Sequence, residues 1–426
     1  MAKPESFFSR GRKFQTADRI VSECQRLGLI MQRGDSGDGA EWVVDGKPLK
    51  NLGSCSYMGL ERHPALLDGA EAALREFGSN FSISRAYLEC SLYRSLEAAL
   101  ECIMDRYVIV APSTTMAHLA ALPVLVGDDD LVLVDQFAHA SIHMATDLIA
   151  DVPIERIRHS RIDLLEQRLE EAGNQYERVW YLCDGIYSML GDFAPFEELE
   201  SLLRRYPKLN LYVDDAHAMS WTGRHGRGAA LTRLGNFDRV VVAVSLSKAF
   251  GATGGALALP TQEQRDRVRR CGGPLMFSGP IPPAGLGAAL ASAKLHLSPE
   301  FEGMQAELQE RMHVARTALS EARLKLATDA DTPIFMIHYD SPQVAQSVVA
   351  ALRARGFYSC VSMFPAVPIN KPSIRFTVSR HNPIADIRAM VEALVEVSAT
   401  LSPSSFQRST PPLAVQEPEQ RLLVGT

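Results

Sequence analysis

Short apolar runs alternate with longer amphipathic segments through the middle of the chain. Each run is rich in Val, Leu and Ile and is bounded by polar or turn-forming residues, a pattern typical of buried strands. The runs predict strands at 107–112, 130–135, 178–185, 209–216 and 239–247. Residues 162–172 and 196–205 lie between them and have the apolar spacing of helices. The alternation predicts an α/β fold with a mostly parallel, doubly wound sheet, in which ligands bind beyond the carboxyl ends of the strands.

The pattern changes on either side of this alternating region. Before it, apolar residues at 15–28 and 64–77 recur at helical spacing. After it, a long charged helix is predicted from Ser298-Pro299, with the serine as its N-cap. The chain then predicts a strand at 334–340, a helix at 342–355 capped by Ser341, strands near 357–363 and 373–379, and a helix from 382 to 400. These elements predict a second, smaller α+β domain, and the Ser-, Pro- and Glu-rich residues 402–426 predict a loose tail.

Composition narrows the class of protein. Of 426 residues, 46% are hydrophobic and 22% are charged, which is ordinary for a folded protein and unlike a disordered chain. Lys and Arg number 44 against 50 Asp and Glu, and the net charge of −6 provides no general basic field for nucleic acid. No apolar run approaches the ~20 residues of a transmembrane segment, and the N-terminus lacks the apolar core of a secretory signal. Seven scattered cysteines without a Cys-x-x-Cys pair predict reduced thiols in a cytoplasmic protein, with no disulfide framework or metal site.

Two predicted strands end in residues with unusual chemistry. Asp214 closes one strand, in VDDAH, and a carboxylate at a partly buried strand end needs a cationic partner such as a protonated heterocyclic nitrogen. An aspartate that caps the following helix is an equally open reading of that motif. Lys248 follows the next strand, in SLSKAFGATGG, where a desolvated amine can form a Schiff base. Because the strand that precedes Lys248 is apolar, the alternative of a surface lysine in a glycine-rich loop is less favoured.

Three further strand ends carry weaker signals. Asp184 and Ser188 follow one strand, and His139 follows another, although most histidines are ordinary core or surface residues. The turn Ser113-Thr114-Thr115 leads from a strand into a helix, where hydroxyls and free amides suit a phosphate but a plain N-cap is commoner. Taken together with Asp214 and Lys248, these are the parts that hold pyridoxal 5′-phosphate: a Schiff-base lysine, a carboxylate, a flat ring and phosphate donors.

Several motifs in this order resemble those of one family. They are NLGSCSYMGL (51–60), HASI (139–142), DGIYSMLGDFAPFEEL (184–199), VDDAHAMSWTGRHGRG (213–228), SLSKAFGATGG (245–255) and IRFTVSRHN (374–382). With them the chain resembles the α-oxoamine synthase family of fold-type I pyridoxal-phosphate enzymes, over roughly residues 45–400. The resemblance implies a fold-type I transferase with a mostly parallel sheet in its large domain. The expected divisions are an N-terminal arm (1–58), a large pyridoxal-phosphate-binding domain (59–290), a small C-terminal α+β domain (291–401) and a flexible tail (402–426).

The resemblance implies four catalytic residues. Lys248 would form the Schiff base with the cofactor and move the α-proton of the amino acid. Asp214 would pair with the pyridinium nitrogen, and His217 would bond the ring hydroxyl. His139 would stack on the face of the ring.

It also implies residues that bind the cofactor and the substrate. The phosphate would be held by the hydroxyl-bearing residues Ser113, Thr114, Thr115 and Ser245. Ser278 would reach the phosphate of the partner subunit across a dimer interface. Asp184 and Ser188 would lie near the ring. Arg375 would bind the carboxylate of the amino acid bidentately, and Ser56 and Tyr57 would line the substrate pocket.

The implied reaction is the decarboxylative condensation of an amino acid with an acyl thioester, giving an α-aminoketone. The chain would then be a biosynthetic pyridoxal-phosphate-dependent C-acyltransferase that uses an acyl-coenzyme A or an acyl-carrier protein. It would be a cytoplasmic homodimer with shared active sites, binding no nucleic acid or metal and having no transmembrane segment. Two alternatives stay open: an aminotransferase of the same fold, and a non-catalytic partner subunit of a related synthase.

Overall fold

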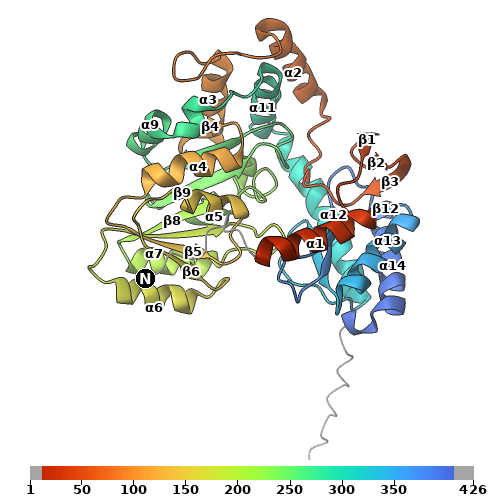
Figure 1. Cartoon of the computed structure of the whole chain (residues 1–426). Helices are drawn as coiled ribbons and strands as arrows, with labels where there is room; N and C mark the ends of the chain where they lie inside the picture. The colour runs from red at the N-terminus through yellow and green to blue at the C-terminus, as the bar shows by residue number, and fades with distance from the viewer. Residues whose placement is uncertain (1–11, 407–426) are drawn as a thin grey trace, which may run out of the picture.

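A sheet of seven strands forms the centre of the larger part of the molecule (Figure 1). The computed structural model describes residues 12–406, so the predicted tail lies almost entirely outside the described residues, as do residues 1–11 of the predicted arm. The strands, in the spatial order β4-β10-β9-β8-β7-β5-β6, are β4 (Tyr107–Ala111), β10 (Gly255–Leu259), β9 (Val240–Ser245), β8 (Leu209–Asp214), β7 (Val179–Asp184), β5 (Leu131–Asp135) and β6 (Ile154–Ile157). All five predicted strands form, with ends that differ by one or two residues, and β6 and β10 are additions.

Most of this sheet is parallel, as predicted. Only β10 runs antiparallel to its neighbours β4 and β9. Every residue of β7, β8 and β9 is buried, because helices cover both faces of the sheet and leave no polar alternation along the strands. The continuous apolar runs in the sequence therefore mark the central strands.

Two hydrophobic clusters lie on the two faces of the sheet. The helices of this larger part are α2 (Pro64–Phe77), α3 (Ser91–Met104), α4 (Thr114–Leu125), α5 (Ala140–Thr146), α6 (Ile162–Ala172), α7 (Phe196–Arg205), α8 (Ala229–Leu234), α9 (Gln262–Cys271), α10 (Gly273–Phe277) and α11 (Pro283–His296). The helices predicted at 64–77, 162–172 and 196–205 have the predicted bounds. No helix within residues 12–406 is long and apolar enough to cross a membrane.

The smaller part of the molecule is built on an antiparallel sheet of order β11-β14-β13. Its elements are α12 (Phe301–Glu321), β11 (Ile334–His338), α13 (Pro342–Ala354), β13 (Cys360–Ser362), β14 (Ser373–Thr377), α14 (Ile384–Leu401) and the 3₁₀ turn η2 (Pro403–Ser405). Ser341 caps α13 as predicted, since its Oγ accepts from the Val344 amide at 3.3 Å. The predicted cap of α12 is wrong. That helix begins at Phe301, and the Ser298 hydroxyl instead donates to the Leu295 carbonyl at the end of α11.

Part of the predicted arm joins this smaller part of the molecule. Helix α1 (Arg12–Arg26) precedes β1 (Gly34–Gly37), β2 (Glu41–Val44) and β3 (Lys47–Asn51), and β3 pairs in parallel with β12 (Phe357–Tyr358). The strand predicted at 357–363 is therefore divided between two sheets, β12 in one and β13 in the other.

This pairing carries the chain after β3 to the edge of β14. The Thr377 amide donates to the Leu52 carbonyl at 2.8 Å, and its hydroxyl donates to the Ser54 carbonyl at 2.6 Å. Residues 52–57 therefore lie beside the strand that carries Arg375. The domain bounds at 58, 290 and 401 stay a prediction.

Candidate active site

The predicted site residues of the large sheet meet at one edge. Asp184 and Asp214 end the neighbouring parallel strands β7 and β8 and are partners in register. Ser245 ends β9, the next strand along. The His139 amide, at the start of α5, donates to Asp184 Oδ1 at 2.9 Å. Parallel strands bring their carboxyl ends together, so residues 30 or more positions apart share one site.

Lys248 reaches toward His217 at this edge. The lysine Nζ lies 3.0 Å from His217 Nε2, and His217 Nδ1 lies 2.8 Å from the Tyr57 hydroxyl. Burial, reinforced by the charge of Lys248, lowers the pKa of His217 well below its ordinary value, so the imidazole is neutral at pH 7. A neutral imidazole that accepts from the lysine at Nε2 carries its proton on Nδ1 and donates to Tyr57. Two hydrogen bonds in series, Tyr57–His217 and His217–Lys248, thus hold the lysine amine at a fixed position, and Tyr57 belongs to the predicted N-terminal arm.

Asp214 is anchored by a residue that the sequence reading missed. His118, in the middle of α4 and fully buried, places Nε2 at 2.9 Å from Asp214 Oδ2 and Nδ1 at 2.9 Å from the Tyr212 hydroxyl. Burial alone would raise the pKa of Asp214, but the imidazole of His118 and the charge of Lys248 outweigh it and leave that pKa well below its usual range. Asp214 is therefore a buried carboxylate that stays ionised.

The adjacent aspartate is in a different state. Asp215 is fully buried, and its Oδ2 accepts from the Ala230 amide at 3.0 Å, away from Lys248. Burial raises the pKa of Asp215 to about 7. The sequence VDDAH contains two carboxylates, and the structure offers only the first as a permanent anion at the strand edge.

The start of α4 lies beside these residues. Ser113 Oγ accepts from the Met116 amide at 3.2 Å, and the Thr114 hydroxyl donates to the Val244 carbonyl at 3.2 Å. Both hydroxyls thus fasten the turn, and the Thr114 and Thr115 amides belong to the first turn of a helix, whose N–H groups have no partners within the helix. Those amides and the positive end of the helix dipole suit a phosphate group.

The adjoining strand ends come close to that turn. Ser245 Oγ lies 3.1 Å from Ser247 Oγ and accepts from the Ser247 amide at 3.2 Å. A Cβ atom on Gly255 would lie 2.5 Å from the Thr114 amide nitrogen, so only glycine allows β10 to start against the turn. This close approach keeps the amides and the serine hydroxyls within one small region.

Arg375 faces the same region from the smaller part of the molecule. It is 6% exposed, its Nε donates to the Ser188 carbonyl at 2.8 Å, and its Nη2 lies 3.4 Å from the Tyr57 hydroxyl. Nη2 also lies 3.8 Å from Cys55 Sγ. Burial would raise the pKa of Cys55, but the charges of Arg375 and Lys248 outweigh it and lower that pKa. Cys55 lies in no cysteine motif, so the sequence alone does not single it out.

Two predicted residues are not brought into this group. The Ser56 hydroxyl donates to Glu61 instead of facing Arg375. The Ser278 hydroxyl donates to the Pro274 carbonyl at 2.5 Å, and within residues 12–406 no hydrogen bond joins it to Lys248, Asp214 or Ser245. The role predicted for Ser278, at the phosphate of a partner subunit, stays a prediction.

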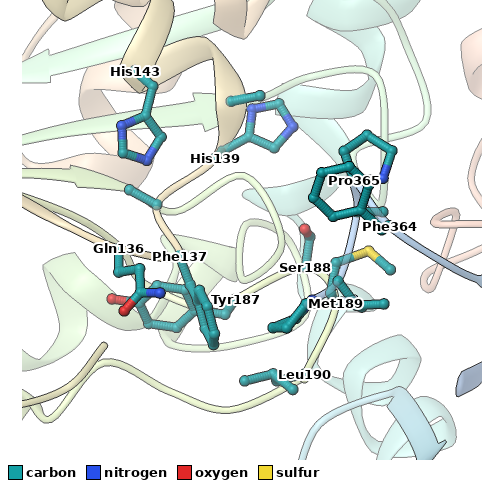
Figure 2. Close-up of a pocket in the computed structure, with 15 residues that line it drawn as sticks. Gln136, Phe137, His139, His143, Tyr187, Ser188, Met189, Leu190, Phe364 and Pro365 are labelled. Carbon is teal, nitrogen blue, oxygen red and sulfur yellow. The ribbon is translucent and has the colours of Figure 1, made fainter. Parts of the chain in front are cut away.

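A cavity of about 510 Å³ opens beside His139 and Ser188 (Figure 2). His139 caps the start of α5, with Nδ1 at 2.6 Å from the Ser141 hydroxyl, and the residue is exposed. An exposed flat ring at the same strand edge as the ionised Asp214 and the Lys248 amine, with helix-start amides nearby, fits pyridoxal 5′-phosphate in charge and in shape.

The chain is similar to proteins of known name. The model of the family described as aminotransferase class I and II matches residues 47–394. The 8-amino-7-oxononanoate synthase of Maricaulis maris is 31% identical over 358 residues, which cover 84% of this chain and 88% of that protein. The mitochondrial 2-amino-3-ketobutyrate coenzyme A ligase of Bos taurus is 30% identical, over 83% of this chain and 84% of that protein.

A solved structure has the same architecture. Serine palmitoyltransferase of Sphingomonas wittichii matches with a TM-score of 0.84 at 24% identity, over 92% of this chain and 99% of that chain. This likeness confirms the predicted fold class.

Proposed function

This chain belongs to the α-oxoamine synthase family of pyridoxal-phosphate enzymes, and we propose that its strand-edge residues carry out the decarboxylative condensation of an amino acid with an acyl thioester. The observation that carries the proposal is the arrangement of Lys248 and Asp214 at adjoining strand ends. One is an amine fixed at 3.0 Å from a neutral imidazole, and the other is a buried, permanently ionised carboxylate.

When bound, pyridoxal phosphate supplies an electron sink that makes the Cα–H bond of the amino acid acidic. Asp214 holds a proton on the ring nitrogen, because its carboxylate stays ionised while buried. Lys248 Nζ removes the Cα proton and later returns one, and His217 Nε2 fixes the position of that nitrogen. His139 covers the ring face, and the amides of α4 with Ser245 hold the phosphate.

Arg375 binds the carboxylate of the amino acid. Its guanidinium is buried and held by the Ser188 carbonyl and the Tyr57 hydroxyl, so the charge is fixed before substrate arrives. After the new carbon–carbon bond forms to the acyl carbonyl, the thiol leaves, and the same carboxylate departs as carbon dioxide. The product is an α-aminoketone.

A second copy of this chain completes the site. Two apolar side chains near Ser278 are strongly exposed, Tyr87 at 86% and Phe277 at 83%. Their segments are joined by the bond from the Ser84 hydroxyl to the Met276 carbonyl. A homodimer that covers this surface would bring Ser278 toward the partner's phosphate site. Light scattering should give twice the chain mass, and Phe277→Glu should shift it toward the single chain.

Two further assignments, the acyl donor and the location in the cell, are less specific. The acyl donor is an acyl thioester of coenzyme A or of a carrier protein, and the enzyme acts in the cytoplasm. The name of the coenzyme A ligase among the relatives supports the first assignment, and the seven scattered cysteines, all of them free, support the second.

The test is a product balance. The pyridoxal-phosphate-loaded protein is incubated with single amino acids and an acyl-coenzyme A, and free thiol, carbon dioxide and keto acid are measured. The proposal predicts thiol and carbon dioxide in equal amounts. Keto acid without thiol would establish the aminotransferase alternative, and no turnover together with no visible absorbance band would establish the non-catalytic one. Lys248→Ala is the negative control.

A further inference from the structure

The cavity beside Ser188 has walls from two distant parts of the chain (Figure 2). One wall follows β5 and β7 and includes Phe137, Met189 and Leu190. The other is the loop of residues 364–368, which lies between β13 and β14. His139 and Ser188 also line the cavity, so it opens next to the ring position and to the carbonyl that holds Arg375.

The lining carries no formal charge. None of its 15 residues is Asp, Glu, Lys or Arg, and the titratable side chains that contribute are two histidines and Tyr187. Burial, with the nearby Arg156 as the second cause, lowers the pKa of His143 to about 4, so this imidazole is neutral at pH 7. Arg156 does not line the cavity. A carboxylate inside would lose water and gain no cation from the lining.

The wall that follows β5 and β7 is held in place by contacts with His159. Phe137 stacks on the His159 ring with centroids 4.7 Å apart, and Tyr187 meets that ring edge-on at 4.3 Å. His159 in turn bridges Asp135 at 3.1 Å and Asp192 at 2.9 Å. This bridge ties the segment after β5 to the segment after β7, and the apolar wall therefore exists before a ligand enters.

We propose that this cavity binds the hydrocarbon chain of an uncharged, aliphatic acyl thioester and discriminates against donors that end in a carboxylate. The inference rests on the proposed condensation and names its acyl donor. A volume of about 510 Å³ lies in the range of sites that hold whole small ligands, larger than one amino-acid side chain needs. The thioester carbonyl would then lie at the Ser188 and His139 end of the cavity, where the condensation takes place.

The test compares matched acyl-coenzyme A pairs. Each pair has a straight-chain acyl group and the ω-carboxyacyl group of equal carbon number, over chains of about four to about twelve carbons. Binding is measured by equilibrium dialysis with the pyridoxal-phosphate-loaded protein, and thiol release is measured in parallel. Affinity for the aliphatic series should rise about fourfold per methylene until the cavity is full. Each ω-carboxyacyl partner should bind at least roughly tenfold more weakly.

A charge placed in the wall sharpens the result. Met189→Arg should weaken the aliphatic donors and strengthen the ω-carboxyacyl donors, because the new guanidinium would pair with the carboxylate. Leu148→Arg, on a residue 55% exposed that does not line the cavity, is the matched control and should change neither series. If thermal melting shows that Met189→Arg does not fold, Met189→Lys makes the same test.

Two results would overturn the inference. One is equal or tighter binding of the ω-carboxyacyl partners by the unaltered protein. The other is an affinity that does not depend on acyl length, as expected if the cavity holds the side chain of the amino acid. Failure of the proposed function is a separate observation: no donor would release thiol with any amino acid, whatever the binding preference.

Discussion

The inner and outer halves of the site are built differently. The inner half consists of two hydrogen-bonded pairs that lie on or beside sheet strands, Lys248 with His217 at 3.0 Å and Asp214 with His118 at 2.9 Å. Its charges are fixed by specific partners. The outer half is the cavity that ends in the loop 364–368, where the lining is neutral and half-exposed.

The inner half is suited to carrying out the reaction, and the outer half is suited to selecting the acyl donor. A carboxylate that must stay ionised while buried needs a partner at a fixed distance, and only a packed strand or helix provides one. A hydrocarbon chain needs only apolar area, which a loop can supply and which can change without disturbing the charged group. Changes in the inner half should therefore lower turnover, and changes in the outer half should alter which donor is used.

The largest effect is expected from Asp214→Asn. The amide cannot hold a proton on the ring nitrogen by charge, so kcat should fall on the order of 10²–10³-fold. Asp215→Asn is the matched control, because that side chain points to the Ala230 amide. Steady-state kinetics with thiol detection measure both variants. Equal losses in the two would show that the inner half is not organised around Asp214.

Arg375→Lys should have the next largest effect. An ammonium cannot reproduce the planar pair of donors, so KM for the amino acid should rise about 10- to 100-fold. The KM for the acyl donor should stay nearly unchanged, since Arg375 does not line the cavity. A matching rise in both KM values would contradict the separation of the two halves.

His118→Asn should have a smaller effect of about tenfold on kcat. The decisive readout is spectroscopic: a pH titration of the visible cofactor band should shift, because Asp214 loses the partner at 2.9 Å that favours its ionised form. Tyr212→Phe removes the hydrogen bond between the Tyr212 hydroxyl and His118 Nδ1 but keeps the His118–Asp214 contact. The titration of this variant should therefore stay close to that of the unaltered protein. An unshifted band in His118→Asn would mean that His118 serves packing alone.

The smallest effect on turnover is expected from His159→Gln, which instead changes stability with pH. Burial would lower the pKa of His159, but its bonds to Asp135 and Asp192 outweigh burial and raise it to about 9. Because the pKa of His159 is higher in the folded than in the unfolded protein, its protonated ring stabilises the fold. This stabilisation is full below the unfolded pKa of about 6.5 and is lost as pH rises through the folded pKa of about 9.

The unaltered protein should therefore exceed His159→Gln in unfolding free energy by up to about 3 kcal/mol near pH 6. The difference should shrink as pH rises from about 6.5 and should be nearly gone above pH 9. Urea unfolding at several pH values measures it. A difference that is constant across this range would show that the ion pairs contribute nothing.

The same two halves explain what the sequence could predict. Buried strands are continuous apolar runs, so the positions of Asp184, Asp214 and Lys248 at or just after the ends of strands could be predicted from the sequence. His118 was missed because a histidine inside an apolar helix looks like an ordinary core residue, and its partner lies 96 positions away. The outer half was missed because it forms only when the loop 364–368 packs against segments that follow β5 and β7. No local pattern encodes such a contact.

Two smaller misses have local causes. The strands β1 and β3 are polar and short, so they lack the alternation that marks a strand. At Ser298, two helices compete for one hydroxyl, and the preceding helix α11 takes it.

Lys248 should be the residue that holds the cofactor, and its bond to pyridoxal phosphate can be trapped directly. The protein is loaded with pyridoxal phosphate, reduced with borohydride, digested and mapped by mass spectrometry. We expect one pyridoxyl adduct, on the peptide that contains Lys248, and none in Lys248→Ala. An adduct on another lysine, or no adduct in the unaltered protein, would contradict it.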